Sequence, residues 1–150
     1  MINSRFTVAV HLLSLLAAGS KKFPGVPITS EVAAESVNTN PVVVRRIMGN
    51  LRKAGLVTSQ PGPNGGWFLQ HEPERITLRE VYRAVQDEQL FSMHHSKPNS
   101  QCMVGGYIQE ALQGYFHEAE AAMEAKLDQK TIADVLTKVR DCAHRQGRIA

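Results

Sequence analysis

Cysteine and long hydrophobic runs are the two features that this sequence most clearly lacks. Two cysteines, Cys102 and Cys142, are too few for a disulfide framework, which favours a reduced, cytoplasmic protein. No apolar stretch approaches the roughly 20 residues that a membrane-spanning helix needs, so we expect no membrane partner. The phosphate-loop, dinucleotide-binding, nucleophile-elbow and zinc-protease motifs are also missing. An enzyme is therefore not expected.

The N-terminal segment fits either a secretory signal or a core helix. Like a signal, residues 1–19 combine an early Arg5 with an apolar stretch and a small-residue end. However, His11 and Ser14 interrupt the apolar part. Apolar residues also recur at the spacing of one helix face, at Phe6, Val10, Leu13 and Leu16. This pattern favours an amphipathic core helix from about Asn3 to Ala18.

The net charge of +3 is small, but it is unevenly placed along the chain. Residues 1–75 carry eight Lys and Arg against four acids, whereas residues 76–150 carry nine against ten. Residues 36–71 contain four basic side chains and no acid. A basic segment beside a balanced one suggests that the first half of the chain has a polyanionic partner.

Two further helices are predicted after the first. Thr29 or Ser30 caps a short helix over residues 30–37. Asn40 followed by Pro41 is typical of a helix start, and this third helix is expected to stop near Gly55. Two short strands follow, at 56–60 and 66–70, joined by a segment whose Asn-Gly and Gly-Gly steps suit a tight hairpin. This is the order of elements in a winged helix-turn-helix.

The second half of the chain predicts three more helices. Thr77 and Glu80 form a capping box for a helix over residues 76–88, and residues 89–103 are expected to form a loop. A helix over residues 104–127 carries an apolar stripe longer than a small domain needs for itself, and a last helix spans about 130–144. The fold class is therefore mainly α with a small β-hairpin wing. We divide it into a DNA-binding domain (1–86), a sensor or linker loop (87–103) and dimerisation helices (104–150).

The third helix is the expected reading element, because the second helix of a helix-turn-helix enters the major groove. Residues near its N-terminal end are expected at base edges: Thr39, Asn40, Val42, Val43 and Arg46. Three cations are expected to reach phosphates: Arg45, Arg52 and Lys53. The wing is expected to approach DNA through Gly62, Asn64 and Gly65. A solvated basic helix and an ordinary turn are the commoner explanations of each feature alone, but their combination favours double-stranded DNA.

Four features stand in sequence from the end of the third helix onward: LRKAGLV at Leu51–Val57, the pattern S-x-x-G-x-x-G-G-aromatic-x-L, Pro73 and the ITLxEV segment at Ile76–Val81. The second pattern falls on Ser59, Gly62, Gly65, Gly66, Trp67 and Leu69. Together they resemble the Rrf2 family of bacterial winged-helix regulators. The resemblance extends over the whole chain. It implies a homodimer whose long helices cross, with two DNA-binding heads and a repressor function.

The sequence departs from the family's better-known members, which bind an iron–sulfur cluster through three cysteines in the loop. Here the loop holds only Cys102, so no such cofactor is expected. Trp67 stands where the family often has a tyrosine. Pro61 stands where many members have an arginine in the wing that contacts a DNA groove, so it is open whether this chain makes that contact. One pattern in the loop resembles the cluster-free branch labelled YwnA-like, at His95, Pro98, Asn99, Cys102, Val104 and Gly105.

The loop is also the candidate sensor, through Cys102, His94 and His95. The positive end of the following helix favours a thiolate at Cys102, which would suit a redox or electrophile sensor. A small ligand or a metal is the alternative, but a metal needs a further ligand, from a second chain or from His11. A packed cysteine with ordinary histidines is the third interpretation, and Cys142 is expected to be an indifferent thiol. Cys102 with His94 or His95 could form the nucleophile pair of an enzyme, but no third group that would orient the histidine is evident. A protein-interaction adaptor remains the alternative to a DNA-binding regulator.

Overall fold

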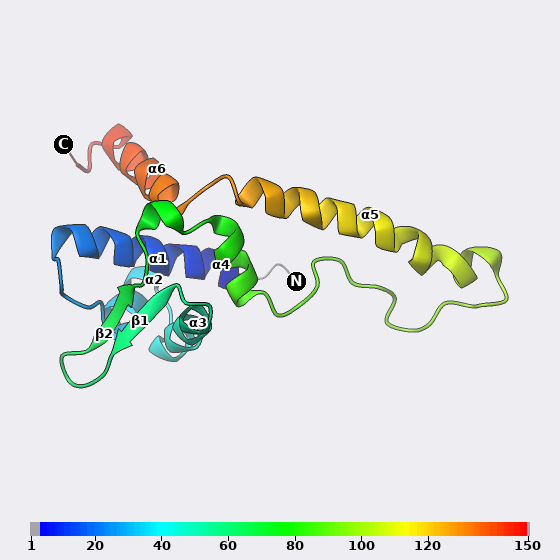
Figure 1. Cartoon of the computed structure of the whole chain (residues 1–150), viewed down its shortest axis with the longest axis horizontal. Coiled ribbons are helices and arrows are strands. Elements are labelled where there is room, and N and C mark those ends of the chain that lie inside the picture. Colours follow the sequence, from blue (N-terminus) through cyan, green and yellow to red (C-terminus); the bar gives the residue numbers. More distant parts are fainter. Residues whose placement is uncertain (1–3, 150) are drawn as a thin grey trace.

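The computed structural model describes residues 4–149, and its elements form a head and an arm (Figure 1). The elements run in this order: α1 (Ser4–Lys22), α2 (Ser30–Val37), α3 (Pro41–Lys53), β1 (Val57–Gln60), β2 (Gly66–Leu69), the 3-10 turn η1 (Pro73–Arg75), α4 (Leu78–Val85), α5 (Met103–Leu127) and α6 (Ile132–Arg145). We call α5 the arm, and residues 4–85 together with α6 the head. The chain leaves the head after α4, runs out beside the arm, and returns along it to α6.

The core of the head is built around α1. This helix contacts α2, α3, α4, α6 and β2, and its residues Leu12, Leu13 and Ala17 are fully buried. From α3, Ile47 and Leu51 are buried in the same cluster. Each large apolar side chain buried in this way stabilises the fold by about 1.5–3 kcal/mol. Among the described residues, no helix has the length and apolar character needed to cross a membrane.

The turn of the helix-turn-helix is set by backbone geometry at both of its ends. Asn38 ends α2 in the left-handed conformation (φ 62), and the N–H of Thr39 donates to the carbonyl of Ala34 at 3.0 Å. Thr39 is followed by Asn40, whose side chain accepts a hydrogen bond from the N–H of Val42 at 2.8 Å and caps α3. These bonds pair N–H and C=O groups that helix ends otherwise leave unpaired, so the angle between α2 and α3 is fixed locally.

The wing is a two-stranded antiparallel hairpin that differs in one detail from the expected tight turn. Val57 pairs with Leu69 and Ser59 with Trp67, and residues 61–65 connect the strands. The left-handed residue of this connection is Gly62 (φ 99), not Asn64 or Gly65. Gly65 is required for another reason, because a Cβ there would lie 2.0 Å from the carbonyl oxygen of Gln60. The wing is also bridged by Ile28, which exchanges backbone hydrogen bonds with Trp67 at 2.8 and 3.1 Å.

Several helix ends differ from the sequence prediction. The helix α1 continues past Ala18 through Gly19 to Lys22. Ile28 packs closely on Gly19, since its Cδ1 would lie 2.8 Å from a Cβ at that position. Its predicted start at Asn3 lies outside the described residues. The helix α4 ends at Val85 rather than near residue 88, and the turn η1 was not expected.

The helix α6 returns to the head. The N–H of Leu78 donates to the carbonyl of Lys130, and the N–H of Ile132 donates to the carbonyl of Ile76, both at 2.9 Å. Ile132 is fully buried, and α6 packs on α1. Both ends of the arm are therefore connected to the head, one through the loop after α4 and the other through this backbone pairing.

Candidate nucleic-acid interface

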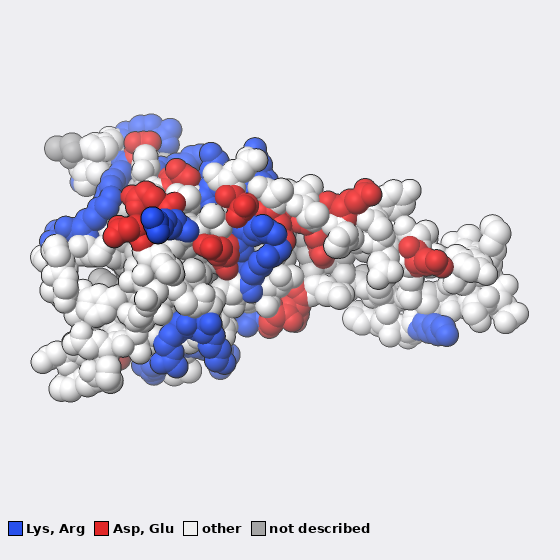
Figure 2. Space-filling model, in the orientation of Figure 1, with Lys and Arg blue, Asp and Glu red and all other residues white. Residues whose placement is uncertain are grey.

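The helix α3 presents one apolar face to the core and one basic face to solvent. Val44, Ile47, Met48 and Leu51 are buried, whereas the basic side chains on the opposite side are exposed. Figure 2 shows Lys and Arg side chains gathered over α3, and the neighbouring wing is free of charge on the face shown. The first turn of α3 contains no acid. A phosphate would therefore meet cations and the positive end of the helix dipole on this face.

The N-terminal end of α3 exposes two valines, Val42 and Val43. Val42 is 52% and Val43 38% exposed, and Thr39 before them is half-buried. Apolar side chains in this position can contact the methyl group of thymine. Asn40 is exposed, but its side-chain oxygen Oδ1 already caps the helix. Only its amide N–H groups therefore remain for a base edge or a phosphate.

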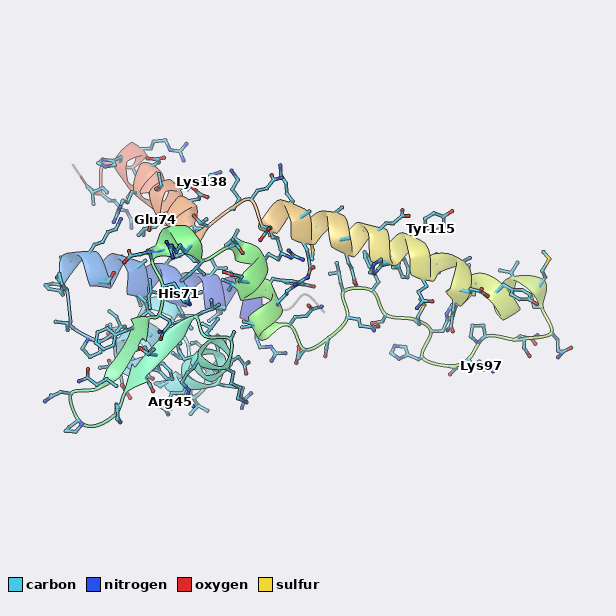
Figure 3. All side chains as sticks on the ribbon, viewed as in Figure 1. Arg45, His71, Glu74, Lys97, Tyr115 and Lys138 are labelled. Carbon is cyan, nitrogen blue, oxygen red and sulfur yellow. The ribbon has the colours of Figure 1, made fainter. Side chains whose placement is uncertain are left out.

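The basic side chains of α3 differ in what holds them. Arg45, labelled in Figure 3, lies 3.7 Å from Glu31 of α2, and both side chains are at least half exposed. Such an exposed ion pair is weak, so a phosphate can displace it. Arg52 donates to the hydroxyl of Ser59 at 3.4 Å, which directs it toward the base of the wing. Arg46 and Lys53 are exposed and show no ion pair within residues 4–149.

A side-chain hydrogen bond that the sequence does not predict ties the wing to the start of α2. The indole N–H of Trp67 donates to the hydroxyl of Ser30 at 3.0 Å, and Ser30 is buried at the start of α2. The wing loop itself is open, since Gly62 and Asn64 are exposed and Gly65 is half-buried. A serine at a helix start and an aromatic residue in a strand carry no signal that they meet. The bond holds the second strand of the wing against the start of α2.

The loop before the arm holds the three candidate sensor residues. Cys102 is exposed at the N-cap of α5, and its side chain makes no capping hydrogen bond. Nδ1 of His94 lies 3.3 Å from the side-chain amide nitrogen of Gln109, and His95 is exposed. In the described part of the chain, no three His, Cys, Asp or Glu side chains come together as a metal would need. His11, considered as a further ligand, is bonded to the hydroxyl of Ser36 at 2.9 Å within the head.

The arm buries none of its residues against the rest of the chain. Val104, Tyr107 and Tyr115 are at least 60% exposed, and Figure 3 shows Tyr115 on the side of α5 away from the loop. On the loop side, Phe91 stacks on Phe116 with ring centroids 4.6 Å apart. A long helix with an uncovered apolar side needs a partner helix to be stable in water.

Comparison with known proteins agrees with this geometry. A family model described as Rrf2, an iron-dependent transcriptional regulator, matches residues 2–138. The chain is 47% identical over 137 residues to YwnA of Bacillus subtilis (strain 168), which bears the name of an HTH-type transcriptional regulator; the match covers 91% of this chain and 97% of YwnA.

Solved structures give the same result. A protein described as DNA-binding is 41% identical with a TM-score of 0.69, over 89% of this chain and 99% of the other. A structure described as a transcriptional regulator from Lactobacillus plantarum is 25% identical with a TM-score of 0.78, over 99% and 100% of the two chains.

The iron in the family description does not fit the residues of this chain. Cys102 precedes α5 and Cys142 lies in α6, where Arg145 donates to its sulfur at 3.1 Å. Two cysteines on different elements cannot supply the cysteine ligands of an iron–sulfur cluster. We therefore assign no role to iron in this chain.

Proposed function

The chain belongs to the Rrf2 family of transcriptional regulators and is not an enzyme, and from this premise we propose that it is a cytoplasmic repressor that binds DNA as a homodimer. The exposed face of α3 carries the proposal. Cations, two exposed valines and an acid-free helix start lie together there. The cations contact phosphates, Arg46 reaches the edge of a base, and the valines contact thymine methyl groups.

The uncovered side of the arm supports the homodimer. A second copy of α5 would cover Val104, Tyr107 and Tyr115, and a closed pair is the commonest assembly that a single self-complementary surface produces. Two heads on a two-fold axis then place their α3 helices in successive major grooves, roughly 34 Å apart. The expected operator is therefore a palindrome.

Titration of the purified protein against DNA from its own promoter tests this proposal. Replacing Arg46 by alanine should weaken binding about 10- to 100-fold and relax the preference at one base pair of each half-site. Replacing Lys53 by alanine should weaken binding to all sequences alike and reduce the salt dependence. Lys97 in the loop, labelled in Figure 3, lies away from α3, and Lys97→Ala serves as the charge-matched control. If Arg46→Ala and Lys53→Ala both bind like the parent, α3 is not the reading helix.

We further propose that Cys102 is the sensor of the repressor. Its exposure leaves the thiol open to an oxidant or electrophile, and its place at the start of the arm links any modification to the dimer. The operator affinity of the parent should change on mild oxidation, whereas that of Cys102→Ser should not. Cys142→Ser, which removes the other exposed thiol, should respond like the parent. A Cys102→Ser protein that still responds would remove Cys102 from the mechanism and direct attention to a small ligand.

A further inference from the structure

A compact cluster of ion pairs connects the head to the arm. Arg83 of α4 binds Glu124 of α5 through two hydrogen bonds, from Nε to Oε1 at 3.1 Å and from Nη2 to Oε2 at 2.8 Å. Arg79, one turn earlier in α4, places its Nε 3.7 Å from the same carboxylate and its Nη1 3.9 Å from Asp128. One glutamate of the arm therefore faces two arginines of the head.

The geometry makes Glu124 the central member of this cluster. Its side chain is only 19% exposed, whereas that of Arg83 is 55% exposed. The paired hydrogen bonds from Arg83, followed in importance by the charges of Arg83 and Arg79, hold the pKa of Glu124 below its ordinary value. A two-point arginine–carboxylate contact fixes orientation as well as distance, which a single hydrogen bond does not. Arg79 adds attraction without a good hydrogen bond, because its buried Nε has no acceptor among the described residues.

The cluster lies at the contact between α4 and α5, where the angle between the head and the arm is set. The helix α4 is the part of the head against which α5 packs, and α4 also packs against α3. A rotation of α4 on the arm would therefore carry α3 with it. In a dimer, such a rotation changes the distance and the angle between the two reading helices.

We propose that Glu124 is a specificity-determining positioning residue, which selects the spacing between half-sites by holding the head at one angle on the arm. This inference rests on the proposed DNA-binding dimer. One added base pair moves a half-site by about 3.4 Å and turns it by about 35° around the duplex. The two-point contact resists that turn. Without it, the backbone pairing of residues 76–78 with 130–132 still connects the head to this end of the arm, but the head can turn further. Glu124 touches no DNA, so its removal should alter discrimination between spacings rather than contact with a half-site.

The experiment measures binding of the full-length protein to its operator and to operators with one or two base pairs added to or removed from the centre. The parent should prefer its own spacing by at least about tenfold. Glu124→Gln keeps the shape of the side chain and removes its charge, and should reduce that preference to about threefold or less. Binding to a fragment with a single half-site should stay within about twofold of the parent, which shows that α3 and the wing are intact.

Two further variants separate positioning from a general structural effect. Arg83→Gln should also lose the preference, and the double variant should be no worse than Glu124→Gln alone, because Glu124→Gln already removes the contact with Arg83. Glu110→Gln is the matched control, since Glu110 is exposed on the same helix and shows no ion pair within residues 4–149; it should keep the parent's preference. Melting curves of all variants check that each one folds.

The outcomes are distinguishable. Full spacing preference in Glu124→Gln overturns the positioning role, and so does an equal loss at all spacings and at the single half-site. A parent that binds the operator without any spacing preference overturns it too. A parent that shows no salt-sensitive operator binding overturns the proposed function itself, and this inference with it.

Discussion

At the scale of single residues, two positions decide how α3 is held between its neighbours. Asn38 ends α2 and Gly55 follows α3, and both adopt left-handed backbone conformations, with φ of 62 and 77. After α3, the N–H of Leu56 donates to the carbonyl of Leu51 at 3.0 Å, and the N–H of Gly55 to that of Arg52 at 2.9 Å. These two bonds end the helix and direct the chain into the wing.

The same substitution should therefore have opposite effects at two glycines. Gly55→Ala should lower the free energy of unfolding by about 1–2 kcal/mol, because a residue with a Cβ is strained at this positive φ. Gly49→Ala, inside α3, should raise it by about 0.5–1 kcal/mol, because no atom beyond the adjoining residues and the helix's own backbone lies within 4 Å of the added Cβ, and alanine favours a helix. Urea unfolding measures both. Equal effects of the two substitutions would contradict the account of how α3 ends.

At the scale of the elements, the sequence predicts best where the signal is local. The capping box of Thr77 and Glu80 is present as expected, with hydrogen bonds of 3.1 and 3.2 Å, and Asn40 caps α3. The bridge from Ile28 to the wing and the continuation of α1 through Gly19 escaped prediction. The bridge depends on a contact between two segments that only the folded chain brings together.

A second capping box, at the start of α6, predicts a dependence of stability on pH. The carboxylate of Asp134 accepts a hydrogen bond from the backbone N–H of Thr131 at 2.9 Å, and the Thr131 hydroxyl accepts one from the N–H of Asp134. The bond from the Thr131 backbone, and then that with its side chain, lower the pKa of Asp134 below its ordinary value. This contribution to stability is complete above the unfolded pKa of about 4 and is lost as the pH falls through the lower folded pKa.

Thermal melts over a range of pH test this prediction. The parent should melt above Asp134→Asn at neutral pH, and the gap should narrow as the pH falls below about 4. Thr131→Ala is the control, because it removes the hydroxyl but keeps the backbone N–H that Asp134 accepts from. It should melt lower than the parent while keeping most of the pH-dependent part, which comes first from the backbone N–H of Thr131. A gap between the parent and Asp134→Asn that does not vary with pH would contradict the role of the carboxylate.

At the scale of the whole molecule, the head is complete in one chain and the arm is not. The head has a continuous buried core, whereas α5 buries none of its residues. The apolar stripe of the arm was predictable from its helical spacing, and so was the basic face of α3. The partners of Glu124 were not predictable, because Arg79 and Arg83 lie more than 40 positions away in the sequence. Nothing in the spacing of charged residues indicates which of them form ion pairs in the folded chain.

The uncovered side of the arm predicts a specific defect in assembly. Tyr115→Glu should raise the dissociation constant of the dimer at least about 100-fold, because a carboxylate buried in an apolar interface is costly. Gln113→Glu adds the same charge to an exposed position close to the opposite side of the helix and should leave the dimer intact. Analytical ultracentrifugation over a range of concentrations measures both. A Tyr115→Glu protein as dimeric as the parent would show that the two copies meet elsewhere.

The most direct test of the central claim is the salt dependence of binding to promoter DNA, compared with a scrambled fragment of equal length. A dimer whose α3 helices contact phosphates in two major grooves should lose about 10³-fold in affinity between 50 and 200 mM salt. At each salt concentration it should prefer the promoter fragment by at least about 10³-fold. That result would establish a sequence-specific DNA-binding regulator. Binding that ignores salt, or equal affinity for both fragments, would contradict the account and indicate a winged helix that serves a protein partner.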